Sequence, residues 1–125
     1  MTYIDTHVAA WLYAGELGLL SDRAQEILSR DELLISPMVV LELQYLFEVG
    51  RTTEPASPVV EALRSLVGLE VCDLPFGQVI GRSLSETWTR DPFDRVVVSQ
   101  AAVRSSPLLT KDKTIHTHYV QAVWE

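Results

Sequence analysis

The sequence predicts an α/β domain built on a mainly parallel sheet. Five short apolar segments alternate with stretches that carry helix caps and helical spacing of apolar residues. Strands that alternate with helices favour parallel pairing, and ligands of such sheets bind beyond the carboxyl ends of the strands. The length of 125 residues fits one domain over residues 1–125, with a core that needs no disulfide.

The first half of the chain is predicted from caps and breakers. Residues 2–5 (TYID) read as a strand, and residues 6–15 as a helix closed by glycine. Residues 21–30 read as an amphipathic helix with serine at its N-cap, followed by a short strand over residues 33–35. Residues 36–50 open with Ser-Pro and end at glycine, which predicts a capped helix.

The second half continues the alternation. Residues 58–67, 76–88 and 92–104 are predicted as helices, and residues 69–74, 107–110 and 122–124 as strands. The valine run at residues 96–98 alone would indicate a strand. Asp-Pro directly before it and Ser-Gln-Ala-Ala directly after it favour a helix instead.

Composition and charge narrow the classes of function. The content of 47% hydrophobic residues is typical of a packed globule, and the single Cys72 excludes an intramolecular disulfide and fits a reducing compartment. The N-terminus lacks the basic region of a signal peptide, so a cytoplasmic protein is expected. A net charge of −7 disfavours a nucleic-acid partner, unless metal ions and a local basic rim offset the repulsion.

Two acids in the first half are candidates for chemistry. Asp5 ends the first strand, where it can cap the next helix or face a ligand. Glu42 shares a predicted helix face with Met38, Val39, Tyr45 and Leu46, which are largely apolar. An unpaired carboxylate on such a face would be costly to bury, so Glu42 needs a buried arginine, a place at the edge of the core, or a ligand.

Three acids in the second half join them. Asp91 before Pro92 fits an N-cap, which makes Asp94 the third helical residue. Asp94 shares a face with the residues of that helix expected to pack on the sheet, and capping alone does not require this orientation. Asp112 follows the fourth predicted strand, where it is either a solvated loop residue or a member of the same acidic group.

Asp5, Glu42, Asp94 and Asp112 together indicate a divalent-cation site. Carboxylates gathered at one edge of a sheet repel each other, and all-oxygen donors favour Mg²⁺ or Mn²⁺. The isolated Cys72 and histidines give no zinc-ligand spacing. Four cations are candidates for a local basic rim, or for a scattered solvated surface: Arg90, Arg95, Lys111 and Lys113.

Four segments carry a resemblance to a known family: "YIDTHVAAWL", "SPMVVLELQYL", "RDPFDRVVVSQA" and "LLTKDK". With these segments the sequence resembles PIN domains, and closely the toxin subunits of VapBC toxin–antitoxin pairs. The resemblance implies a three-layer α/β/α fold with a parallel sheet of about five strands. It also implies a Mg²⁺-dependent endoribonuclease, with Mn²⁺ as a possible substitute and with Asp5, Glu42, Asp94 and Asp112 as the catalytic and metal-binding acids.

The resemblance carries further expectations. Asp91, Thr110 and Thr6 would orient the four acids without binding the metal themselves. Thr89 stands where close relatives often carry histidine, which leaves the acidic positions intact. The expected partners are an RNA substrate, a cognate antitoxin that binds near the active site, and a second copy of the toxin in a homodimer.

Two other classes remain open from the sequence. A metal-dependent phosphatase on a similar α/β fold would use an aspartate nucleophile such as Asp5. Enzymes of that kind usually carry a second aspartate two residues later, where this chain has His7. An inactive PIN-like interaction protein is the non-enzymatic alternative, although all four acids are present.

Overall fold

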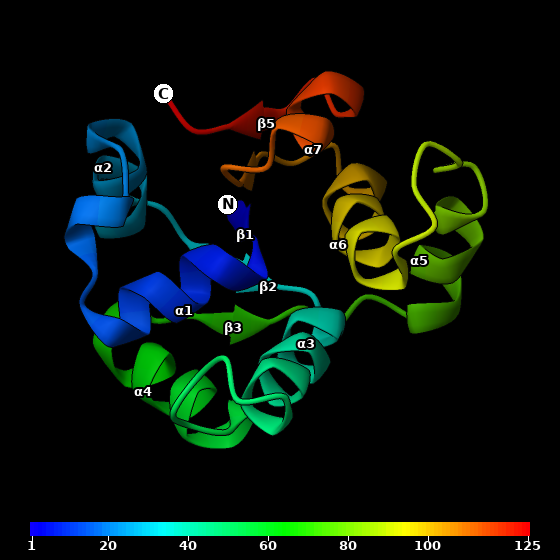
Figure 1. Ribbon diagram of the computed structural model, residues 1–125. Helices are drawn as coiled ribbons and strands as arrows, with labels where there is room; N and C mark the ends of the chain where they lie inside the picture. Colours follow the sequence, from blue (N-terminus) through cyan, green and yellow to red (C-terminus); the bar gives the residue numbers. More distant parts are fainter.

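The computed structural model describes all 125 residues as an α/β fold around a five-stranded parallel sheet (Figure 1). The strand order is β3-β2-β1-β4-β5, and every neighbouring pair is parallel. The strands are β1 (Thr2–Ile4), β2 (Leu33–Ile35), β3 (Glu70–Val71), β4 (Leu108–Leu109) and β5 (Ala122–Val123). The helices are α1 (Thr6–Ala14), the 3₁₀ helix η1 (Leu17–Leu19), α2 (Asp22–Arg30), α3 (Pro37–Glu48), α4 (Ala56–Val67), α5 (Phe76–Ser83), α6 (Pro92–Val103) and α7 (Lys113–His118). The predicted fold class is confirmed.

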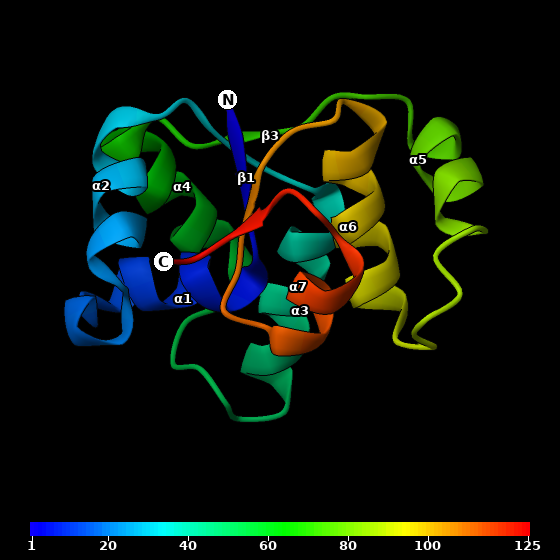
Figure 2. The same cartoon turned by 90° about the horizontal axis from the view of Figure 1, so that it is seen from above.

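The order of the strands places helices on both faces of the sheet. The chain moves outward from β1 to β2 and β3, then returns to β4 and β5 on the other side of β1. Parallel crossovers are right-handed, so reversing the direction of travel moves the connecting helices to the opposite face. Figure 2 shows α2 and α4 on one side of the strands, and α5 and α6 on the other. In the same view α1, α3 and α7 gather where β1 ends.

Local signals account for most helix boundaries. The Ser21 and Ser36 hydroxyls accept hydrogen bonds from backbone N–H groups at the starts of α2 and α3. Gly68 follows α4 with a φ of +70°, a left-handed conformation that glycine adopts without steric cost. These caps explain why the predicted starts of α2 and α3 match the structure.

The largest error in the predicted helices concerns α5, which ends at Ser83 and not at Trp88. Trp88 leaves the helical path and stacks on His118, with ring centroids 4.9 Å apart and ring planes 7° apart. The tryptophan N–H also donates to Glu86, at 2.6 Å. A contact between residues so distant in sequence leaves no local signal, which is why the helix was predicted too long.

Other boundaries also differ from the prediction. Helix α4 begins at Ala56, two residues before Pro58, because the first turn of a helix leaves its N–H groups unpaired and tolerates proline. The third strand is confined to Glu70–Val71, although the Cys72 N–H still donates to the Ile35 carbonyl at 2.8 Å. The elements η1 and α7 were not predicted from the sequence.

The core lies between the sheet and its covering helices. It contains 27 buried apolar residues. They come from strands β1, β2 and β4 and from most of the helices. Cys72, which follows β3, and Trp124, which follows β5, belong to the core at the two edges of the sheet. Residues of β1, β2 and β4 are buried throughout, as expected for strands covered on both faces. No helix is both long and apolar enough to cross a membrane.

Candidate active site

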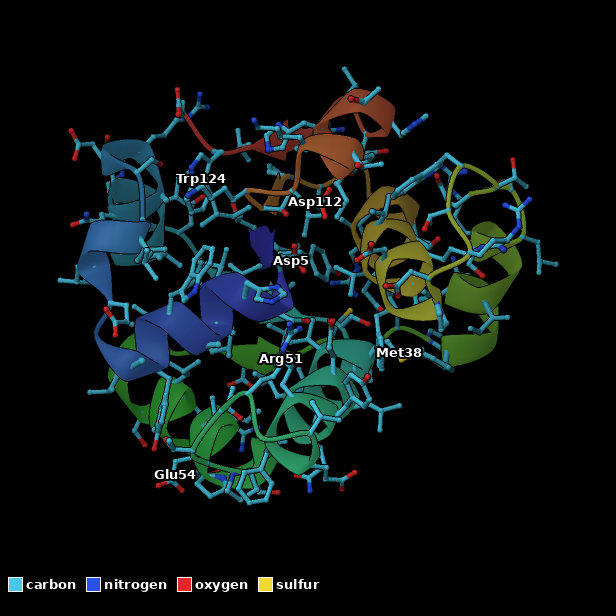
Figure 3. All side chains as sticks on the ribbon, viewed as in Figure 1. Asp5, Met38, Arg51, Glu54, Asp112 and Trp124 are labelled. Carbon is cyan, nitrogen blue, oxygen red and sulfur yellow. The ribbon has the colours of Figure 1, made fainter.

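An acidic cavity of about 740 Å³ opens at the carboxyl end of the sheet. Five carboxylates from separate parts of the chain line it, together with two cations, Arg51 and Lys111. The acids are Asp5, Glu42, Asp91, Asp94 and Asp112. Strands β1 and β4 are neighbours, so the residues that follow them emerge side by side, and Figure 3 shows Asp5 and Asp112 close together there. The structure therefore brings all four predicted catalytic acids to one cavity.

Asp5 is held at the floor of the cavity by two hydrogen bonds. Its Oδ1 accepts from the Thr6 N–H at 2.7 Å, and its Oδ2 accepts from the Thr110 hydroxyl at 2.6 Å. Burial raises the pKa of this carboxyl, and the two hydrogen bonds offset part of the rise. Asp5 is thus both the cap of α1 and a member of the acidic group, so the two interpretations of the sequence coexist.

Glu42 reaches the cavity from the middle of α3. Its Oε1 accepts a hydrogen bond from the Thr6 hydroxyl at 2.5 Å, and no arginine or lysine pairs with it. The buried salt bridge considered from the sequence is therefore absent. Burial raises the pKa of Glu42, the Thr6 hydrogen bond opposes that rise, and nearby Asp5 adds to it. The helix face is less buried than predicted, since Tyr45 is exposed.

Asp91 and Asp94 enter the cavity at the start of α6. Asp91 Oδ1 accepts from the N–H groups of Phe93 and Asp94, at 2.8 and 3.3 Å, which confirms the predicted cap. The Thr89 hydroxyl accepts from the Asp91 N–H at 3.1 Å. Asp94 is half-buried at the third helical position, and burial, with repulsion from the surrounding acids, raises its pKa to about 7.

Asp112 occupies a helix cap that the sequence did not reveal. Its Oδ1 accepts from the Ile115 N–H at 3.0 Å, at the start of α7, and the residue remains exposed to solvent. Its own N–H donates to the Thr110 hydroxyl oxygen at 3.1 Å. Because the same hydroxyl donates to Asp5, Thr110 couples the ends of β1 and β4.

The carboxylates are near one another but do not form a ready-made metal cage. No group of three or more His, Cys, Asp or Glu side chains is placed to hold one ion. Asp5, Glu42 and Asp112 instead accept hydrogen bonds from the protein. Their oxygens are the donors that Mg²⁺ and Mn²⁺ prefer, and their mutual repulsion would be relieved by a cation. The chemistry of these donors suits a divalent cation, although their present positions do not surround one.

Only one of the four predicted rim cations lines the cavity. Lys111 does so, whereas the Arg90 and Arg95 side chains donate to the carbonyls of Thr87 and Ser83. Lys113 lines a separate hollow near β5. Arg51, which follows the end of α3, supplies the second cation of the cavity and was not predicted. No motif marks it, because its position depends on where α3 ends relative to α1.

Known proteins resemble this chain over most of its length. Residues 2–119 match the family profile described as PIN domain. Ribonuclease VapC22 of Mycobacterium tuberculosis is 30% identical over 121 residues, which cover 92% of this chain and 89% of the relative.

Solved structures share the fold at lower identity. VapBC2 from Rickettsia felis, bound to a DNA fragment from its promoter, aligns with a TM-score of 0.68 and 16% identity over 100% of both chains. A toxin–antitoxin complex from Klebsiella pneumoniae aligns with a TM-score of 0.66 and 14% identity, over 98% of this chain and 96% of the other. VapBC-1 from nontypeable Haemophilus influenzae aligns with a TM-score of 0.65 and 17% identity, over 100% of this chain and 97% of the other.

Proposed function

The chain belongs to the PIN domain family, and on that premise we propose that it is a metal-dependent endoribonuclease and the toxin of a toxin–antitoxin pair. The observation that carries the proposal is the convergence of Asp5, Glu42, Asp94 and Asp112 on one cavity. The raised pKa of Asp94, about 7, reflects burial and the repulsion of several carboxylates at short range. The ribonuclease name of the 30% identical relative supports the same class of reaction.

The proposed cofactor is Mg²⁺, with Mn²⁺ as a substitute. Asp5 and Asp94 would hold the cation, with Glu42 and Asp112 completing the acidic group. A bound divalent cation supplies positive charge to a phosphate oxygen and lowers the pKa of a water molecule. Thr6 and Thr110 fix the orientation of the acids through hydrogen bonds to Glu42 and Asp5.

Two cations of the chain would bind the substrate next to the acids. Lys111 and Arg51 on the cavity wall attract the anionic substrate and offset part of the acidic field. Attack of water on phosphorus, in line with the departing 3′ oxygen, would leave a 5′-phosphate and a 3′-hydroxyl.

An antitoxin and a second copy of the chain are the proposed protein partners. Helix α3 and its C-cap expose four large apolar side chains, of which Tyr45 also lines the cavity: Leu41, Tyr45, Phe47 and Val49. An exposed apolar surface of this kind is typical of protein interfaces. The structural neighbours are toxin–antitoxin complexes, which supports the pairing. The protein encoded beside this chain is the partner to co-express, and it should suppress RNA cleavage.

The test is cleavage of a mixed pool of structured RNA by the purified chain with Mg²⁺, Mn²⁺ or EDTA. Asp94→Asn should abolish cleavage, while the matched Asp73→Asn, at a side chain that is 97% exposed, should cleave like the wild type. A parallel titration with Mn²⁺ reports whether the acids bind a cation independently of activity. Cleavage that survives EDTA or Asp94→Asn would refute the metal assignment. A folded wild type that binds no Mn²⁺ would favour the interaction protein.

A further inference from the structure

Trp11 lies at the junction of two hollows. The acidic cavity adjoins a second hollow of about 700 Å³, and both are lined by His7, Trp11, Leu46 and Arg51. These four residues line both hollows, which are therefore neighbours along α1 and are together called the Trp11 groove. The second hollow has no carboxylate from the catalytic group, so its contribution is to binding.

The Trp11 ring is held in a fixed orientation. Its edge packs on the buried Trp124, with centroids 6.2 Å apart and an interplanar angle of 63°. His7 lies on the cavity side at 6.0 Å, tilted by 47°. Trp11 itself is only half-buried, which leaves part of its ring accessible from the groove. A flat aromatic surface that is already ordered binds a partner at a small entropic cost.

Two cations, Lys111 and Arg51, line the acidic cavity together with this ring. Lys111 Nζ lies 6.0 Å from the centre of the Trp11 ring, at the outer limit of a cation–π contact. Because this contact with the neutral ring is weak, the lysine can turn to an anion at little cost in free energy. Arg51 lies between α1 and α3, across Asp5 from Asp112 in Figure 3. Neither cation forms a salt bridge, although the chain carries a net charge of −7.

We propose that Trp11 stacks on an unpaired base beside the scissile phosphate, and that Arg51 binds a backbone phosphate of the same strand. An aromatic ring beside cations is the combination with which proteins bind a single strand, through base stacking and phosphate contacts. A base within a duplex has no free face, so stacking on Trp11 selects an unpaired segment of RNA. Every base has a π-face, so this contact selects no particular base. This inference rests on the proposed function, because it assigns a substrate contact to that site.

Binding of two fluorescein-labelled octamers, measured by anisotropy in Ca²⁺, tests the stacking contact. One probe is an adenosine octamer, and the other has the same phosphates with abasic tetrahydrofuran spacers throughout. A gel confirms that both remain intact. The wild type should bind the adenosine probe about 5- to 150-fold more tightly, the range expected when one base stacks on an aromatic side chain. Equal affinity for the two probes would overturn the proposal.

Variants locate the contact. Trp11→Leu should bring the ratio of affinities toward one, and Trp11→Phe should keep most of it. Trp11→Met fills more of the space beside Trp124 and replaces Trp11→Leu if that variant does not fold. Arg51→Ala should weaken both probes by the same factor. The matched control is Phe76→Leu, at a side chain that is 44% exposed and lines neither hollow, and it should retain the wild-type ratio.

The outcomes separate this proposal from the nuclease assignment. A base preference that disappears in Trp11→Leu supports the stacking contact, even if no RNA is cleaved. Cleavage that requires Asp94 but is unaffected by Trp11→Leu, together with an unchanged base preference, would overturn the stacking contact alone. An intact base preference combined with weakened binding of the protein partner would assign the Trp11 groove to that protein.

Discussion

Replacing Asp94 with asparagine should stabilise the metal-free protein at alkaline pH. Asp94 is half-buried among Asp5, Glu42, Asp91 and Asp112, and its pKa is raised from 3.8 to about 7. The folded chain therefore binds more protons than the unfolded chain between these pH values. Its free energy of unfolding falls as the pH rises through this window and levels off above it. Asparagine keeps the shape of the side chain and removes the titrating charge.

The size of the effect follows from the shift in pKa. A shift of about 3 pKa units corresponds to an upper limit of about 4 kcal/mol. Asp94 retains contact with water, and screening reduces this to about 1–2 kcal/mol. The lost interaction of the carboxylate with the start of α6 subtracts about 0.3–1 kcal/mol. A net gain of about 1 kcal/mol remains, or about 4 °C in Tm for a domain of this size.

Urea and thermal unfolding, followed by circular dichroism in EDTA, measure the difference. Wild type, Asp94→Asn and Asp73→Asn should be compared at about pH 3 and about pH 8, below and above both pKa values of Asp94. The difference in free energy of unfolding between Asp94→Asn and the wild type should be near zero at the lower pH. It should reach its full value at the higher pH. Asp73→Asn should stay within about 0.5 kcal/mol of the wild type, because Asp73 is exposed and lies 3.8 Å from Arg104.

Addition of Mg²⁺ should reverse the order of stability. A cation that binds the folded wild type stabilises it by mass action, and Asp94→Asn would bind the cation less tightly. If Asp94→Asn were less stable than the wild type in EDTA at alkaline pH, or if its effect did not change with pH, the carboxylates would not repel one another as described.

Two further substitutions test the hydrogen bonds that build the site. Thr110→Val removes the donor to Asp5 and the acceptor for the Asp112 N–H, so it should lower the free energy of unfolding by about 1–3 kcal/mol and weaken Mn²⁺ binding in a calorimetric titration. Unchanged stability and unchanged Mn²⁺ affinity would contradict that role. Ser36→Ala removes the cap of α3 and the donor to the side-chain amide oxygen Oε1 of Gln100 at 2.9 Å, for an expected loss of about 1–2 kcal/mol in urea unfolding. The matched Ser29→Ala removes an exposed hydroxyl within α2 and should change stability by less than about 0.5 kcal/mol, so equal losses in the two variants would refute the cap argument.

The sequence alone determined the α/β class, the order of most elements and the acids of the candidate site. These features have local causes that one sequence displays. Ser36-Pro37 caps a helix, Asp91-Pro92 caps another, and apolar runs without polar alternation mark strands covered on both faces. Asp5 and Asp112 follow neighbouring strands, so the edge at which they meet was predictable once the strands were parallel.

Only the tertiary structure decided the ends of some elements and the partners of the acids. Helix α5 ends at Ser83, and Trp88 beyond it stacks on His118, a contact between distant residues that the sequence does not indicate. The sequence marked Glu42 as needing a partner, and the packing of α3 against α1 selected the Thr6 hydroxyl. The same packing brought Arg51 to the cavity. Such contacts depend on how separate helices pack, and therefore on the whole fold, whereas caps and strand patterns depend on a few adjacent residues.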